Sequence, residues 1–77
     1  ISSSAKSFLE KILKEGFISK KEATKLAMDE GLFLNVFINN INDELFEYIN
    51  DQTLVIEDDR ILIDEFYREM VKELIDG

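Results

Sequence analysis

The segment GLFLNVFINNINDELFEYIN, residues 31–50, is the densest apolar stretch of the chain and decides how the rest of it must fold. Its apolar residues recur at steps of three and four, which is the spacing of a helix with a buried face. The stripe consists of Leu34, Ile38, Ile41, Leu45 and Ile49, and it is widened by Phe33, Val36 and Phe37. We therefore predict a central helix that is buried on most of its circumference.

A first helix is predicted near the N-terminus. Ser4 or Ser7 can supply its N-cap, because a serine oxygen accepts a hydrogen bond from a free backbone N–H of the first turn. The apolar pattern runs to about Glu15, and Gly16 is placed to end the helix in the left-handed conformation. We expect residues 17–18 to form a short extended segment or a hydrophobic staple.

A second helix is predicted directly before the central one. Ser19 and Glu22 have the spacing of a capping box, so this helix runs from Lys20 to about Glu30, and Gly31 closes it. A connection this short makes the second and central helices neighbours that cross at an appreciable angle, as in a helix-turn-helix.

Two short β-branched arms follow the central helix and predict a β-hairpin around Asp58 and Asp59. If these aspartates form a two-residue turn, charges and apolar side chains both match across the strands. In that register Glu57 lies opposite Arg60, Ile56 opposite Ile61 and Leu54 opposite Ile63. A longer loop that starts at Glu57 is the alternative, because two aspartates adopt positive φ less readily than Asn-Gly or Asp-Gly.

Asp64 is the predicted N-cap of a last helix, residues 65–75, which docks along one side of the domain. Its apolar residues are Phe66, Tyr67, Met70, Val71, Leu74 and Ile75. The chain thus predicts an α+β fold that is mostly helical and winged-helix-like. It has three N-terminal helices with a long central third helix, a short β-hairpin and a C-terminal helix.

The composition limits the functions that this protein can have. A chain of 77 residues makes one domain, residues 1–77, and contains no Cys and no His. Disulfides, thiolate nucleophiles, zinc sites and His-dependent catalytic triads are therefore excluded. No run approaches the ~20 apolar residues of a membrane span, and we expect a cytoplasmic protein. Because the sequence starts at Ile1 rather than Met, we expect a C-terminal fragment of a larger protein.

The net charge of −8 is unevenly distributed. Residues 1–30 carry six lysines and five acidic residues, whereas residues 31–77 carry three basic and twelve acidic residues. Phosphate backbones are repelled by such a surface, because nucleic-acid affinity depends on Lys and Arg. Lys20, Lys21 and Lys25 gather near the start of the second helix but are too few to reverse this.

Three short patterns carry a family resemblance. A capped helix ends in Gly31-Leu32, the central helix carries Ile41-Asn42, and an apolar strand runs into residues 57–59, Glu-Asp-Asp. Over residues 9–63 this arrangement resembles the TerB-C domain, the C-terminal domain of bacterial proteins linked to tellurite resistance. The resemblance implies an accessory module of a multidomain cytoplasmic protein without catalysis of its own, and the acidic positions of the family suggest metal chelation.

Acidic residues gather in what the sequence predicts to be a single corner of the hairpin, namely Glu57, Asp58, Asp59 and Asp64. Hard cations need several oxygen ligands that converge, and a hairpin tip can supply two or three. Their spacing matches no calcium loop, so we expect no cofactor, with weak binding of Ca²⁺ or Mg²⁺ as the alternative. A paired-carboxylate enzyme is not expected, because so small a domain has little depth for a cleft.

Five residues of the central helix are candidates for interaction: Asn42, Phe33, Phe37, Phe46 and Tyr48. Asn42 lies in the apolar row, so its amide needs partners, either the backbone of the hairpin and of residues 50–53 or a ligand. We expect most of the aromatic residues in the core, with one or two left exposed at a protein interface.

The sequence thus predicts a non-enzymatic interaction module whose partner is another protein or a neighbouring domain of the same chain. A weak divalent-cation domain is the first alternative. The second is a degenerate winged-helix domain for nucleic acid.

Overall fold

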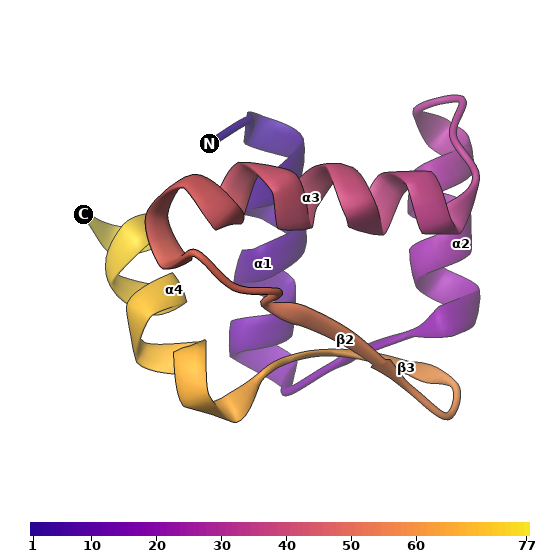
Figure 1. The fold of residues 1–77 in the computed structure, drawn as a ribbon. Coiled ribbons are helices and arrows are strands. Elements are labelled where there is room, and N and C mark those ends of the chain that lie inside the picture. The colour runs from indigo at the N-terminus through magenta and orange to yellow at the C-terminus, as the bar shows by residue number, and fades with distance from the viewer.

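The computed structural model describes all residues, 1–77, as four α-helices and a small antiparallel sheet. The elements are α1 (Ser3–Glu15), β1 (Ile18–Ser19), α2 (Lys20–Asp29), α3 (Leu34–Ile49), β2 (Leu54–Glu57), β3 (Arg60–Ile63), the 3₁₀ turn η1 (Glu65–Tyr67) and α4 (Arg68–Asp76). Helix α3 lies across α1, with α2 near its beginning and α4 near its end (Figure 1). The α+β, mostly helical class and the order of elements predicted from the sequence are confirmed.

Helix α1 begins earlier than the sequence predicted. Its N-cap is Ser2, whose Oγ accepts a hydrogen bond from the backbone N–H of Ala5 over 3.2 Å. The prediction of Ser4 or Ser7 as the cap was wrong, because several serines in a row can each satisfy the same free N–H groups. The other end was predicted correctly, since Gly16 ends the helix at a φ of 94°.

Helix α2 begins as predicted, with Ser19 Oγ accepting a hydrogen bond from the backbone N–H of Glu22 over 3.1 Å. The Glu22 carboxylate pairs with Lys11 of α1, which fixes the two helices together at this point. Gly31, at a φ of 73°, redirects the chain toward α3.

The sheet has three strands in the order β1-β3-β2, where the sequence predicted a hairpin alone. The hairpin register is confirmed, with Glu57 opposite Arg60 and Leu54 opposite Ile63. In the turn only Asp58 has a positive φ, of 55°, so one aspartate rather than two adopts this conformation. The predicted extended segment becomes β1 because Ile18 pairs with Ile61 on the other side of β3.

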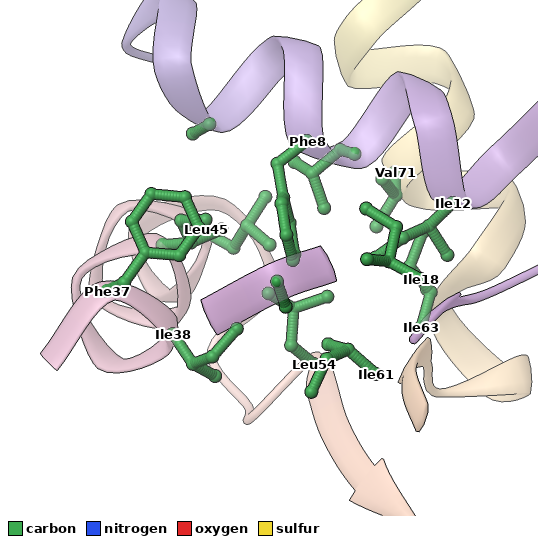
Figure 2. Packing of buried hydrophobic residues seen from close by; sticks show 14 of the residues in the cluster. Phe8, Ile12, Ile18, Phe37, Ile38, Leu45, Leu54, Ile61, Ile63 and Val71 are labelled. Carbon is green, nitrogen blue, oxygen red and sulfur yellow. The ribbon is translucent and has the colours of Figure 1, made fainter. Parts of the chain in front are cut away.

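The core lies between α1, α3 and the sheet (Figure 2). Phe8 of α1 meets Phe37 of α3 edge to face, with 5.2 Å between the ring centroids. The prediction that α3 is buried on most of its circumference was wrong, because Val36 and Phe46 on its outer side are exposed. One stripe on a helix this long is enough to cover a core of this size.

The chain enters α4 through η1, where Asp64 Oδ1 accepts a hydrogen bond from the N–H of Phe66, as an N-cap does. Val71 is buried, while Arg68 donates a hydrogen bond from Nη2 to the backbone carbonyl of Leu13 over 2.9 Å. Phe66 and Met70 are exposed, which corrects their predicted place on the docked face. Only part of the apolar residues of this helix thus faces the core.

We interpret the arrangement as winged-helix-like, because α2 and α3 form a helix pair and the hairpin follows α3 as a wing (Figure 1). None of the helices combines the length and the apolar character that a membrane span requires.

Candidate interaction surface

Asn42 has a structural role, because its side-chain amide is hydrogen-bonded within the domain. Its Oδ1 accepts hydrogen bonds from the backbone N–H groups of Leu54 and Thr53, over 2.8 and 3.3 Å, and its Nδ2 donates to the carbonyl of Leu54 over 3.3 Å. The predicted bonds to the hairpin and to residues 50–53 are therefore confirmed. Because these bonds occupy the buried amide, Asn42 is not available to a partner, which corrects its place among the interaction residues.

Phe37 is also part of the core, with 4% of its surface exposed. Its ring packs against Phe8, so it fixes the angle at which α3 crosses α1. Phe37 therefore holds the surface in place rather than forming part of it.

The other three aromatic candidates face solvent. Phe33 precedes α3 and is 86% exposed, while Phe46 and Tyr48 near the end of the helix are 52% and 56% exposed. The expectation that most of these rings are buried was wrong. Aromatic rings that remain exposed are the usual anchors of protein interfaces.

Tyr48 is the centre of a hollowed surface. It lines three shallow hollows, which together join the end of α3, helix α4 and the two chain ends. The first of these, which we call the α3–α4 groove, is lined by Tyr48, Ile49, Met70, Glu73 and Leu74. Four of these five residues are apolar or aromatic, so the groove offers an apolar floor on an otherwise charged protein.

The charge on this side of the molecule is negative. Helix α3 contains Asp43, Glu44 and Glu47 and has no Lys or Arg at all. Glu44 accepts hydrogen bonds from the N–H and Oγ of Ser2, over 2.6 and 2.9 Å, and so holds the first residues against α3. In a winged-helix-like fold α3 occupies the place of the helix that enters a DNA groove, and here it would be repelled.

A comparison of the sequence with family models shows the family of this chain. The family model for the TerB-C domain matches residues 1–72, which run from the start of the chain into α4. The chain belongs to the TerB-C family. No curated protein and no solved structure gives a significant match to it.

The match runs from α1 into α4 as far as Lys72. It includes the α3 wall of the α3–α4 groove and Met70 of the α4 wall, whereas Glu73 and Leu74 follow it. The family resemblance predicted from the sequence is confirmed, and it extends beyond the residues 9–63 on which it was based. Through this family the chain is a domain associated with tellurite resistance.

The predicted cation corner is not a single corner in this TerB-C domain. Glu57, Asp58 and Asp59 lie at the hairpin tip, whereas Asp64 follows the other end of β3 and caps η1. The five residue steps from Asp59 to Asp64 span about 16 Å of extended chain. No group of three acidic side chains in the structure is arranged to hold a metal ion.

The hairpin tip instead approaches lysines. Asp59 lines a shallow hollow with Lys20 and Lys21, and its carbonyl accepts a hydrogen bond from the backbone N–H of Lys20 over 2.6 Å. Lys20 and Lys21, which are already too few to bind phosphate, thus adjoin an aspartate of the hairpin, and this weakens them further as a site for an anion.

One hydrogen bond of the TerB-C domain perturbs two ionisable groups. Tyr67 of η1 donates its O–H to the carboxylate of Asp51, which lies between α3 and β2. This bond lowers the pKa of Asp51, helped by the backbone N–H of Gln52, and it raises the pKa of Tyr67. Asp51 is exposed and Tyr67 half-buried, so the bond ties two segments together at the surface and forms no reactive centre.

Sequence reasoning missed half of the TerB-C groove. Met70 was assigned to the docked side of the last helix but is exposed. Leu74 packs against the core as predicted, but it also lines the groove beside Tyr48. The apolar residues of α4 follow one helical stripe, so nothing in the sequence indicated that part of this stripe lines a groove.

Proposed function

We propose that this TerB-C domain is a non-enzymatic accessory module that binds another protein or a neighbouring domain in a bacterial cytoplasmic protein linked to tellurite resistance and stress response. The observation that carries the proposal is the exposure of Tyr48 at the junction of three hollows. A hydrophobic anchor surrounded by charged residues is the common pattern of a protein interface.

The charges on α3 favour a protein over a nucleic acid. A helix with three acidic residues and no basic residue repels phosphates, but it attracts a basic protein surface and steers its approach. The apolar groove next to it gives such a partner a place to bury side chains.

Catalysis is not part of the proposal, because the sequence has no His or Cys and the Glu57–Asp64 carboxylates do not converge. The pKa shifts at Asp51 and Tyr67 arise from their mutual hydrogen bond at an exposed position, so they do not point to an acid–base pair in a cleft.

Photo-crosslinking in cells tests the proposal. A benzophenone amino acid replaces Tyr48 in the natural full-length chain, and in a matched control it replaces Lys14, which is exposed on α1. We expect a discrete protein adduct from position 48 that is absent from position 14. If Tyr48, Phe46 and Phe33 all give no adduct beyond that of the control, or if the isolated domain shows catalytic turnover, the proposal is wrong.

A further inference from the structure

The α3–α4 groove lies between two helices and is lined mostly by apolar side chains. Its walls are the last turn of α3 and the side of α4, and its apolar side chains Ile49 and Leu74 are already half-buried against the core. Tyr48 and Met70, which is 51% exposed, stand on either side of them. A third helix laid into this groove would cover all four side chains with apolar residues at i, i+3 or i+4, and i+7.

The rim of the groove is acidic. Glu73 lines the groove itself, and Asp43 and Glu47 line the adjoining hollow beside Tyr48. None of these three carboxylates forms an ion pair within the domain, since the only ion pair in the structure joins Lys11 and Glu22. Lys6, in the third hollow, is the one basic side chain that lines this surface. The groove is thus complementary to a cationic partner.

A second copy of the chain does not supply that partner. Each copy carries a net charge of −8. The residues from Gly31 onward include both walls of the groove and carry three basic against twelve acidic residues, a net charge of −9. Like charges at an interface are costly, so two such surfaces oppose one another. The lysines of α1 and α2 lie on helices whose apolar sides are already packed in the core.

Resting on the proposed function, we infer that the α3–α4 groove binds a cationic amphipathic helix of a separate partner protein. The apolar stripe of that helix covers Tyr48, Met70 and Leu74. Its flanking Lys and Arg side chains face Glu47 and Glu73. Burial of the apolar stripe supplies most of the affinity, and the charges set the orientation and the association rate.

The test is an NMR titration of the isotopically labelled domain with a synthetic peptide of about 14 residues, long enough for roughly four helical turns. The peptide has Leu at helical spacing and Lys at its flanking positions. Two control peptides replace Leu by Ser or Lys by Glu. We expect saturable amide shifts centred on Tyr48, Ile49, Met70 and Leu74 with the Leu-Lys peptide alone, and a weaker affinity as salt is raised.

Two methionines offer a matched pair of variants. Met70→Glu should weaken binding at least ~10-fold, because it places a charge on the apolar floor of the groove. Met28→Glu, at a methionine of α2 that is 69% exposed, should leave it unchanged. The double variant Glu47→Lys, Glu73→Lys should lose the Leu-Lys peptide and gain the Leu-Glu peptide. This exchange is a gain of binding that a merely unfolded protein cannot show.

Several results would overturn the inference: shifts that are diffuse or centred on another surface, equal binding of the Lys and Glu peptides, or equal effects of Met70→Glu and Met28→Glu. A dimer that forms through this groove, or a flanking helix of the same chain found in it, would also replace the inferred partner. If the peptide fails but position 48 still forms an adduct in cells, only the chemistry of the partner is wrong. If the peptide binds but position 48 forms no adduct in cells, the proposed function is wrong, whereas the preference of the groove for a cationic amphipathic helix is supported.

Discussion

Arg68 of α4 donates a hydrogen bond from Nη2 to the backbone carbonyl of Leu13, 55 positions earlier in the chain, over 2.9 Å. Leu13 lies in the last turn of α1, where helix carbonyls lack a partner within the helix and the dipole is negative. A guanidinium at this place therefore satisfies a free acceptor and complements the dipole, and it joins the first helix to the last.

We expect Arg68→Ala to lower the free energy of unfolding by about 1.5–3 kcal/mol, the usual range for a hydrogen bond that involves a charged group. Urea unfolding followed by circular dichroism measures this change. Lys72→Ala, an exposed residue of the same helix, serves as the control and should change the midpoint little. Equal midpoints for the two variants would show that the Arg68 bond does not hold α4 in place.

Asn42→Ala should cost more, about 2–4 kcal/mol of unfolding free energy, because it leaves two buried N–H groups and one carbonyl at Thr53 and Leu54 without a partner. Thermal or urea unfolding gives the value. Asn39→Ala removes an exposed asparagine from the same helix and controls for helix propensity. An Asn42→Ala protein as stable as the Asn39→Ala protein would contradict the role given to these bonds.

The two phenylalanines at the start of α3 should respond in opposite ways to truncation. Phe37→Ala removes a core ring that packs against Phe8 and should destabilise by about 3–5 kcal/mol. Phe33→Ala removes an exposed ring and should stay within about 0.5 kcal/mol of the wild type. Differential scanning calorimetry of both variants measures these two changes in stability. A large loss for Phe33→Ala would place this ring in the core after all.

The Tyr67–Asp51 bond gives the domain a defined pH dependence. The lowered pKa of Asp51 means that this contribution to stability is complete above pH 3.8 and is lost as the pH falls through the lowered pKa. Because the pKa of Tyr67 is raised, the contribution of the bond to stability is complete below pH 10.0 and is lost as the pH rises through the raised pKa. In Tyr67→Phe we expect the carboxyl carbon of Asp51, followed by NMR, to titrate closer to 3.8. Tyr48→Phe should leave that midpoint where it is in the wild type.

Titration with Ca²⁺ and then Mg²⁺ tests the alternative of a cation site. Because Asp64 lies at the far end of β3 from the hairpin tip, we expect only small, diffuse amide shifts at millimolar cation. Addition of NaCl to the same ionic strength is the control for general screening. Saturable shifts confined to residues 57–59 and 64 would restore the metal hypothesis.

Features set by neighbouring residues were predicted well. The structure has the Ser19 cap, the Gly16 and Gly31 stops and the hairpin register as predicted, because each depends on a few consecutive side chains. The Ser19–Glu22 capping box is only half formed, since the Glu22 carboxylate pairs with Lys11 instead of the Ser19 backbone. Strand β1 was missed, because two residues show no alternation and Ile18 is extended only through its pairing with Ile61. The cap of α1 was misplaced for the opposite reason, since a run of serines offers several equal choices.

The candidate surface was harder to predict. Phe33 continues the apolar pattern of α3 but lies before its first turn, so the helical period does not place it. Tyr48 and Met70 line one groove only because α4 returns to the end of α3, and no local pattern encodes that arrangement. The hydrogen bonding of Asn42 could be predicted, because a polar side chain in an apolar row needs a nearby backbone partner.

The Asn42 amide has a consequence for association between strands. An exposed edge strand invites another chain to extend the sheet, which is a common route to aggregation. Leu54, on the outer strand β2, gives both its N–H and its carbonyl to the Asn42 side chain, so this amide stands where the backbone of an added strand would bind. One asparagine thus closes the first residue of the β2 edge to β-augmentation by an added strand.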